Sequence, residues 1–437
     1  LPYGPVGGRV TMMLHIPGQK TPAVYGMSTA DEATVSEVTV LAYKDNAGAE
    51  TLAEMIAVPA NQVSVISGGV KIAVDIPTDN YNRIVIVANA NAELSSLSPG
   101  SDISELQNLT YTSTTGRWDI ATPAYIPISG QILAQIPNGI AITEGVAKVF
   151  SNVNMTRVLA RIDVINQAAS GFTLNNVWLY NFNRNGLIMP GSQYGSSPAQ
   201  PSLPASVLSI DPNPMVYDFA ALSVSGQLSG EIYTFEAAAP QGASIGTSPR
   251  LILEGVYNGS IYFYPADFTY NGTNGAAAGT YMPIVRNHKY VFTIVEVKGP
   301  GYSSAAEALA SPNSYTNNID VKLLAVDDNF QDIYYDKDNL LAVTKTSYAF
   351  ESSEYSLLTE TNLLSILTDV PGGWSATFMG SDGITATNWL SLTPVSGASG
   401  IKANAYIKVT QTAVSRTGYI IIKAGRLTAR VKVEQTI

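Results

Sequence analysis

Short runs of alternating apolar and polar residues follow one another along this chain, and the first clear run lies in RVTMMLHIPGQKTPA (9–23). Its apolar positions recur at every second residue, the period of a strand with one buried face; they are Val10, Met12, Leu14 and Ile16. Pro17 and Gly18 end the run, because proline donates no hydrogen bond to a β-ladder and glycine permits a turn. Lys20 follows in what we expect to be an exposed loop open to proteolysis. The sequence therefore predicts a first strand beside a cleavable loop.

Further strands are predicted in the first third of the chain, at residues 35–43, 70–76 and 83–89, with Gly, Pro, Asn and Asp turns between them. One short helix is expected over Ser101–Asn108, with Ser101 or Asp102 as its N-cap and Glu105 in its first turn. Residues 155–166 fit two structures, since Arg157 and Arg161 have helical spacing. The β-branched residues in that stretch favour a strand.

The middle and last parts of the chain carry the same strand signal. In the middle part the predicted strands are residues 174–182, 231–237, 250–256, 260–264 and 288–297. A Gly/Ser/Pro-rich stretch at 191–204 is long enough to be a mobile or functional loop, and residues 317–328 are predicted as a strand before an acidic linker. Near the end, residues 419–423 and 427–434 flank Ala424-Gly425-Arg426, the pattern of a β-hairpin.

Composition narrows the class of protein. The 437 residues are too many for one core, so two or three domains are expected. Only 13% of the residues are charged, well below the usual fraction, as is typical of strand-rich exported proteins. The net charge of −10, without a Lys/Arg cluster, argues against a nucleic-acid partner, and the absence of cysteine excludes disulfides and thiol chemistry. We expect a signal peptide, and any lipid-bearing cysteine, upstream of Leu1.

Catalytic and metal-binding patterns are missing from the sequence. The two histidines, His15 and His288, have no nucleophile or second metal ligand at a useful spacing, and no nucleotide-binding motif occurs in its required setting. We therefore expect no enzyme activity, no cofactor and no metal. A glycosidase is the remaining enzyme class, since the fold and not the sequence sets the spacing of its two carboxylates. Five aspartates between residues 327 and 338 offer oxygen ligands for calcium but lack the EF-hand pattern, and we interpret them as a solvated linker.

Aromatic side chains give the candidate residues for glycan binding, which are Tyr262, Tyr264 and Trp374. The two tyrosines lie in an aromatic-rich hairpin over residues 257–270. Exposed rings would stack on sugars, whereas buried rings would belong to a core. Alternation places Phe263 on the face opposite the two tyrosines, so at least one face of the hairpin should be core. For Trp374 a place in a sandwich core is the favoured interpretation.

Five segments in series resemble the fimbrillin (major fimbrial subunit) family of the Bacteroidales. They are the stretch 9–23, IPTDNYNRIVIVANAN (76–91), YIPISGQI (125–132), MTRVLARIDVIN (155–166) and PIVRNHKYVFTIVEVKGPGY (283–302). The resemblance implies two transthyretin-like β-sandwich domains, at 1–165 and 166–328. It also implies that a protease removes the first strand, after Lys20 or, as the weaker candidate, Arg9. The family usually has arginine at the matching loop, and the opened groove accepts a strand from another subunit.

The last part of the chain resembles the BACON domain, a small immunoglobulin-like β-sandwich of the Bacteroidetes that is often attached to carbohydrate-active proteins. The resemblance rests on Trp374, NWLSLTPVSGASG (388–400), RTGYIIIKAG (416–425) and RVKVEQ (430–435). It implies a third domain at 342–437, after an acidic linker at 329–341. The expected fold is all-β, with two fimbrillin-type sandwiches followed by a small immunoglobulin-like sandwich.

These resemblances imply a fimbrial (pilus) subunit at the cell surface, exported through the outer membrane as a lipoprotein precursor and assembled by donor-strand complementation. Its partners would be other fimbrial subunits, a processing protease, and host or microbial glycans or surface proteins. A tip or accessory position is favoured, because residues 427–434 are predicted to belong to a folded hairpin and the other candidate donor, 317–325, is tethered at both ends. The alternative is a glycan-binding surface lipoprotein that does not polymerise. A first strand inside a sheet favours the fimbrial subunit, and a strand at a sheet edge favours the alternative.

Overall fold

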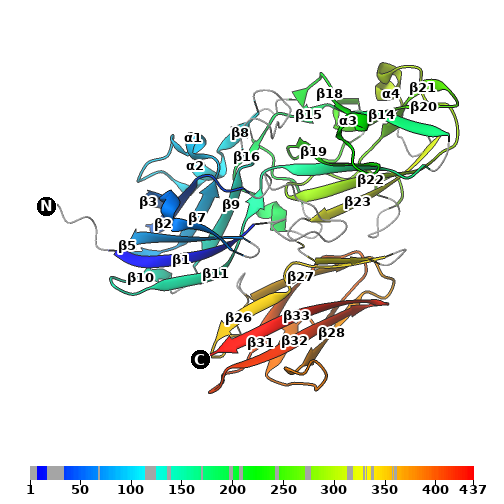
Figure 1. Cartoon of the computed structure of the whole chain (residues 1–437). Helices are drawn as coiled ribbons and strands as arrows, with labels where there is room; N and C mark the ends of the chain where they lie inside the picture. The colour runs from blue at the N-terminus through cyan, green and yellow to red at the C-terminus, as the bar shows by residue number, and fades with distance from the viewer. Residues whose placement is uncertain are drawn as a thin grey trace.

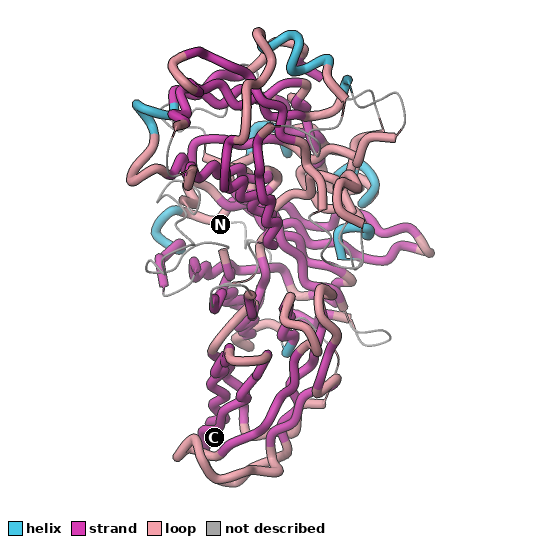
Figure 2. Tube along the Cα trace, turned by 90° about the vertical axis from the view of Figure 1, so that its right-hand side faces the viewer, coloured by secondary structure: helices cyan, strands magenta, loops and turns pink. Residues whose placement is uncertain are grey.

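The computed structural model describes most of the chain, in three β-sandwiches. The described residues are 7–16, 34–66, 69–113, 125–134, 139–168, 171–195, 200–205, 210–241, 246–270, 277–312, 318–327, 330, 332–335, 339–356, 358 and 362–437. We call the sandwiches N-terminal (within 7–157), middle (within 160–327) and C-terminal (within 332–437). The first two lie side by side with the third below them (Figure 1), and a view from the side again places the C-terminal sandwich at one end (Figure 2).

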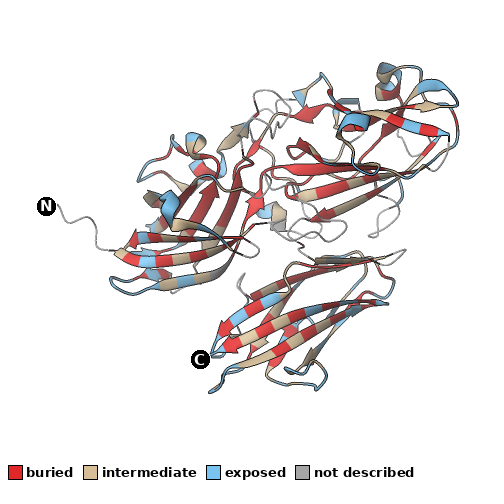
Figure 3. Cartoon of the chain, viewed as in Figure 1, coloured by how far each residue is buried: buried red, intermediate tan, exposed pale blue. Residues whose placement is uncertain are grey.

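The N-terminal sandwich consists of two sheets that enclose one apolar core. The first sheet has the order β11-β1-β5-β4, made of strands Lys148–Asn154, Gly7–His15, Gly69–Pro77 and Val63–Ile66. The second has the order β12-β9-β7-β2-β3, made of Thr156–Arg157, Ile128–Leu133, Arg83–Ala88, Val38–Asn46 and Ala49–Ala57. Buried residues alternate with partly buried or exposed ones along β1 and β5, because only one face of their sheet meets the core (Figure 3).

Two short helices, α1 (Asn91–Leu94) and α2 (Ile103–Gln107), cover the outer face of the second sheet. Leu94 and Leu106 pack there against Val85 of β7, so β7 is buried on both faces. The helix predicted over Ser101–Asn108 is confirmed as α2. The Asp102 carboxylate accepts a hydrogen bond from the Ser104 N–H at 2.9 Å and Glu105 accepts one from the Asp102 N–H at 3.0 Å, a capping box.

The middle sandwich repeats this plan with four strands in each sheet. One sheet has the order β19-β13-β22-β23, from Gln227–Thr234, Ala160–Asn166, His288–Val297 and Ile319–Asp327. The other has the order β18-β14-β20-β21, from Met215–Asp218, Phe172–Tyr180, Arg250–Tyr257 and Ser260–Ala266. Helices α3 (Phe219–Leu222) and α4 (Ala305–Ala310) lie beside the second sheet. The core between the sheets includes Phe268, whose ring meets Phe292 edge-on at a centroid distance of 5.1 Å.

The C-terminal sandwich has five strands in each sheet. One sheet has the order β24-β25-β27-β31-β29, from Asp332–Tyr335, Leu340–Val343, Leu363–Thr368, Ala403–Val409 and Leu390–Thr393. The other has the order β26-β33-β32-β28-β30, from Ser347–Glu351, Leu427–Thr436, Arg416–Ala424, Trp374–Met379 and Ser396–Gly397. The hairpin predicted near the end of the chain is confirmed, since β32 and β33 pair from Arg416 opposite Gln435 up to Ala424 opposite Leu427. Gly425 has a φ of 56° in the turn, a conformation that glycine adopts without strain.

Short elements complete the described ranges. They are the paired strands β6 (Asp79–Tyr81) and β10 (Ile140–Ile142), β8 (Thr110–Thr112) and β16 (Asn185–Leu187), and β15 (Phe182–Asn183) and β17 (Ile210–Asp211), with the 3-10 turns Ala60–Gln62 and Ser192–Gly195. The pairing of β8 with β16 joins the N-terminal and middle parts of the chain. None of the helices in the described part of the chain has the length and apolar character that crossing a bilayer requires.

The all-β prediction is confirmed, and two local predictions differ from the structure. Residues 155–166 form two strands, β12 and β13, which belong to different sandwiches. The chain crosses between them at Val158 and Leu159, which pack with Tyr233 in a small core of their own. The stretch 329–341, interpreted as a linker, contains β24, which pairs with β25 and so extends a sheet. The linker prediction rested on acidic composition. β24 nevertheless forms a strand because it pairs with β25, whose residues are all buried.

Candidate functional site

β1 is the first strand of the described residues and also an interior strand of its sheet. It runs parallel to β11 on one side and antiparallel to β5 on the other, with Gly7 through His15 opposite Pro77 through Gly69. The four predicted inward side chains are at most 1% exposed; they are Val10, Met12, Leu14 and Ile16. This interior position is the one that the fimbrial interpretation requires of a removable strand.

We call the space that β1 fills between β11 and β5 the β1 groove. Without β1, the hydrogen-bonding edges of β11 and β5 would be left unpaired, and core residues such as Ile72 and Val74 would be uncovered. Each inward side chain of β1 contributes about 1.5–3 kcal/mol through burial. Any strand with apolar residues at alternate positions could regain these contacts. The groove is therefore suited to accept a replacement strand.

The two candidate processing residues, Arg9 and Lys20, have different settings. The Arg9 side chain is exposed and forms an ion pair with Asp75 at 3.1 Å. Its backbone, however, is paired with Asp75 in the ladder between β1 and β5, so a protease would reach it only after the strand had opened. Lys20 lies outside the described residues.

Gly69 of β5 lies opposite His15 at the end of β1. A Cβ atom on Gly69 would lie 1.9 Å from the carbonyl oxygen of Leu14, which is closer than real contacts allow. Gly69→Ala should therefore push the end of β1 away from β5 and raise amide exchange rates there by about tenfold or more, as measured by hydrogen–deuterium exchange. Gly246→Ala is the control, since nothing lies within 4 Å of its added Cβ. Unchanged exchange rates of the Leu14 and His15 amides would contradict this prediction, because they would show that β1 and β5 accommodate the added methyl group without losing their hydrogen bonds.

Two of the aromatic candidates for glycan binding, Tyr264 and Trp374, are core residues. This corrects the sugar-binding role considered for Tyr264 and agrees with the sandwich core that the sequence favours for Trp374. Tyr264 is 1% exposed and donates its hydroxyl to the Gly299 carbonyl at 2.9 Å, and Trp374 is 2% exposed in the core of the C-terminal sandwich. Tyr262 is half-buried and packs against the core of the middle sandwich. The opposite face of this hairpin is covered as well, because Phe263 packs edge-on against Trp178. Both faces of the hairpin thus serve packing.

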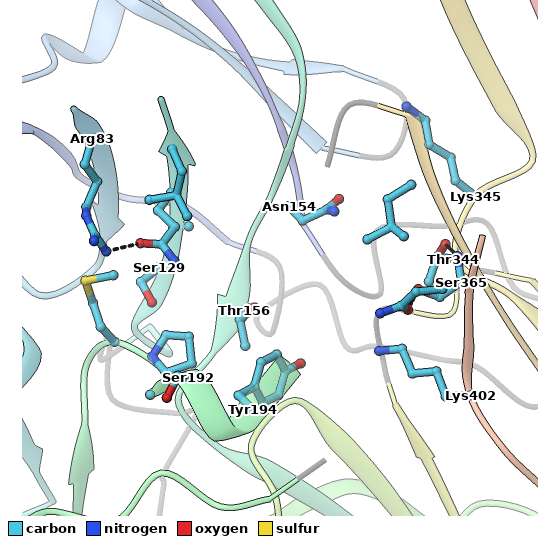
Figure 4. Close-up of a pocket in the computed structure, with 18 of the residues that line it drawn as sticks. Arg83, Ser129, Asn154, Thr156, Ser192, Tyr194, Thr344, Lys345, Ser365 and Lys402 are labelled. Atoms are coloured by element: carbon cyan, nitrogen blue, oxygen red, sulfur yellow. Dashed lines mark hydrogen bonds between the residues drawn. The ribbon is translucent and has the colours of Figure 1, made fainter. Parts of the chain in front are cut away.

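A cavity of about 720 Å³ lies where the three sandwiches meet (Figure 4). This volume falls in the range of about 300–1,000 Å³ that is usual for small-molecule sites. Among its lining residues are Arg83, Ser129, Asn154 and Thr156 from the N-terminal sandwich, Ser192 and Tyr194 from the segment after β16, and Thr344, Lys345, Ser365 and Lys402 from the C-terminal sandwich. Ser192 and Tyr194 belong to the stretch 191–204 that composition marked as a possible functional loop. The other walls come from strands and turns far apart in sequence, so no local signal could have found them.

The described lining residues of this cavity include three cations and no carboxylate. Two of the cations have carboxylate partners outside the lining. Arg83 donates to Glu50 at 2.7 Å and to the amide oxygen of Gln131 at 2.8 Å, which fixes its guanidinium against the wall. Lys402 donates to Asp327 at 2.7 Å and so ties the C-terminal sandwich to the end of β23.

Lys345, the third cation, is held over an aromatic ring. Its Nζ lies 4.8 Å from the ring centroid of Tyr348, and the Tyr348 hydroxyl donates to the Leu363 carbonyl at 2.6 Å, which fixes the ring. Burial lowers the pKa of the Lys345 ammonium to about 8, because the charged form has lost part of its water. Below that pH the cavity therefore contains a partly desolvated positive charge.

The β1 groove and the cavity share a wall at Asn154. This residue ends β11, where it pairs with His15 at the end of β1, and it also lines the cavity. The next backbone N–H, of Met155, donates to the His15 carbonyl at 2.9 Å. The end of β1 and the cavity therefore adjoin at two consecutive residues, Asn154 and Met155.

Histidines and aspartates show no metal-binding arrangement within the described ranges, where no three His, Cys, Asp or Glu side chains are placed to hold an ion. His288 directs its Nδ1 at the Arg286 carbonyl at 2.8 Å. Of the five aspartates predicted to form a linker, Asp327 and Asp332 are in the described ranges, and Asp327 is the partner of Lys402.

Comparisons with known proteins give similarities in structure alone. No family model matches the chain, and no curated protein matches it. The tip fimbrial protein Mfa3 of Porphyromonas gingivalis, with a C-terminal truncation, is 17% identical with a TM-score of 0.46, over 73% of this chain and 99% of that one. A "putative cell adhesion protein" of Bacteroides eggerthii is 16% identical with a TM-score of 0.44, over 75% of this chain and 98% of that one. One with the same description from Parabacteroides distasonis is 14% identical with a TM-score of 0.47, over 73% and 97%. At such identities and TM-scores these similarities do not establish a shared function.

Proposed function

We propose that this protein is a cell-surface fimbrial subunit that accepts a strand from another subunit after its own β1 has been cut free. The observation that carries the proposal is the interior place of β1, between β11 and β5, at the beginning of the described chain. An incoming strand with the same alternation would regain the ladder bonds on both sides and the burial of four apolar side chains. The strand and the groove together are what donor-strand assembly requires.

Cleavage gives the exchange its direction. While β1 is joined to the rest of the chain, it competes with any incoming strand at an effective concentration in the millimolar range. A cut after Lys20 would turn β1 into a free peptide, which dilutes away once it has left the groove. Before the cut the same strand would keep the core covered and the sheet edges paired.

We infer a tip or accessory position, because neither candidate donor strand is free to leave its own sandwich. β33 lies between β26 and β32, with Ala429, Val431 and Val433 at 0% exposure. Withdrawing it would open the core of the C-terminal sandwich at a cost of several kcal/mol. β23 is an edge strand, but it is continuous with chain on both sides, and its Leu323 is 7% exposed. A subunit that accepts a strand without donating one ends a filament.

N-terminal sequencing and labelling of assembled fimbriae test this function together. We expect mature chains that begin after Lys20, or after Arg9, and immunogold label that is sparse and confined to fimbrial ends. Mature chains that begin upstream of Arg9 would contradict the processing step. Dense label along the shaft would contradict the tip position while leaving strand acceptance intact.

The second candidate function is a glycan-binding surface lipoprotein that does not polymerise, with the BACON-like C-terminal sandwich as part of its binding site. The cavity at the junction of the three sandwiches favours it, since the C-terminal sandwich contributes Lys345, Ser365 and Lys402 to that cavity. Both candidates are cell-surface adhesins without enzyme activity. The presence or absence of the protein in purified fimbriae distinguishes them.

A further inference from the structure

The turn between β10 and β11 closes one end of the β1 groove, where β1 begins. Figure 1 shows β10 beside the start of β1. Within the turn the Val146 N–H donates to the Thr143 carbonyl at 3.2 Å, and the Lys148 ammonium donates to the Ala141 carbonyl at 3.0 Å. Ile142, the last residue of β10, is 3% exposed in the core of the N-terminal sandwich. The turn is therefore fixed by hydrogen bonds and packing of its own.

Gly8 of β1 lies directly against this turn. Residues two apart on a strand share a face, so a side chain at residue 8 would point into the core as Val10 does. A Cβ atom on Gly8 would lie 2.6 Å from the carbonyl oxygen of Thr143 and 2.9 Å from Cγ2 of Ile142. Both distances are below 3.0 Å, and the carbonyl oxygen belongs to the backbone, which cannot rotate aside as a side chain does. The groove has room for the four inward apolar side chains of β1 but for no side chain at residue 8.

The register of the strand is fixed on both sides, so residue 8 has a defined place in the groove. β1 pairs with β5 residue by residue from Gly7 to His15, whereas its pairing with β11 shifts between Met12 and Leu14. A strand displaced by one residue would turn its apolar side chains away from the core, and a strand displaced by two would lose its match with the irregularity in β11. An incoming strand that regains the contacts of β1 therefore places one particular residue beside the turn.

We propose that the β1 groove selects a donor strand that has glycine two residues before its first buried apolar residue. This inference rests on the proposed function and adds the chemistry of the partner. The partner is an extended segment of another subunit, with glycine in the place of Gly8 and apolar residues in the places of Val10, Met12, Leu14 and Ile16. A strand with a side chain at the first of these places would have to displace the turn or leave the beginning of the groove unfilled. Glycine otherwise weakens strands, so its presence at this place in a donor is a specific requirement of the groove.

Competition between peptides for the β1 groove tests the proposal. A recognition sequence for a specific protease is placed after Lys20, the full chain is cut there, and labelled peptides then compete with its own β1. We expect the unaltered peptide of residues 7–16 to enter the groove and the same peptide with Gly8→Ala to bind about tenfold more weakly, because a methyl group is forced against the turn. Alanine disfavours strands less than glycine does, so this loss would not come from intrinsic propensity. Thr11→Val, on the opposite face of β1, is the control and should change binding by less than about threefold.

The uncut chain supplies a second measurement that does not depend on strand exchange. Gly8→Ala in the full chain should raise the amide exchange rates of Arg9 and Val10 by about tenfold, measured by hydrogen–deuterium exchange, whereas Thr11→Val should leave them unchanged. The proposal is overturned if the Gly8→Ala peptide binds as the unaltered peptide does, or if Gly8→Ala leaves the exchange rates of Arg9 and Val10 unchanged. Failure of the unaltered peptide to enter the cut chain would contradict strand acceptance itself, on which the proposal rests, so the two failures are distinguishable.

Discussion

Met12→Ala should loosen β1 far more than Met13→Ala, although the two methionines are neighbours on one strand. Met12 is fully buried in the core of the N-terminal sandwich, and truncating it removes apolar contacts and leaves a cavity, which costs about 2–5 kcal/mol. Since each 1.4 kcal/mol is a factor of ten, the population of molecules with β1 out of its groove should rise by about 30-fold to several thousand-fold. Met13 is half-buried on the other face of the strand, and its truncation should cost less than about 1 kcal/mol.

Hydrogen–deuterium exchange at the β5 amides that face β1 is the appropriate measurement, because three separate cores make a single unfolding free energy ill-defined. A peptide of residues 7–16 added to the Met12→Ala protein should restore the protection when in excess, since it can refill the opened groove. Equal effects of the two substitutions would show that β1 is held by its ladder bonds and not by its buried face. The β1 groove would then have no side-chain preference for a donor strand.

The strands could be predicted where their signal is local. Residues 288–297 are predicted as a strand and form β22 with the same bounds, because turn residues border a stretch centred on the β-formers of Tyr290–Val295. The helix α2 was predicted from its cap, since a capping box involves only residues within one turn. The partners of β1 could not be predicted in this way. β11 pairs with it in parallel from residues 148–154, and no local pattern encodes a pairing across that length of chain.

The buried ion pairs of the protein could not be predicted from the sequence. Arg161, Arg250 and Arg286 resemble surface residues by type, yet each is at most 2% exposed and forms an ion pair inside the protein. The aromatic residues were ambiguous for a different reason, since a tyrosine ring such as that of Tyr264 suits either a core or a sugar site. Which face a second layer covers depends on the packing of elements such as α4, and alternation alone does not specify that.

Arg286→Ala should destabilise the junction of the N-terminal and middle sandwiches by about 3–5 kcal/mol. The guanidinium is 0% exposed and donates to Glu236 at 2.9 Å and to the carbonyls of Leu187 and Ile188 at 2.7 and 3.2 Å. Leu187 belongs to β16, which pairs with β8 of the N-terminal part of the chain. The Arg286 side chain therefore links Glu236 to the segment that joins the N-terminal and middle sandwiches. Its loss leaves the carboxylate of Glu236 buried at 2% exposure without its cation.

The double variant Arg286→Met with Glu236→Leu distinguishes two sources of the penalty. One is the unpaired carboxylate of Glu236, and the other is the loss of the hydrogen bonds to the carbonyls of Leu187 and Ile188. If the penalty comes mainly from the uncompensated carboxylate, the double variant should recover a large part of the stability lost in Arg286→Ala, since paired apolar replacements of a buried ion pair are often tolerated. If it comes from the carbonyls of Leu187 and Ile188, the double variant should remain as unstable as the single one. Lys432→Ala is the control for an exposed pair, because Lys432 and Glu434 are each 42% exposed and water screens their ion pair, which should contribute little to stability. Hydrogen–deuterium exchange near each substituted pair measures the local free energy of opening in all three variants, and a loss in Arg286→Ala no larger than that in Lys432→Ala would rule out a structural role for the buried pair.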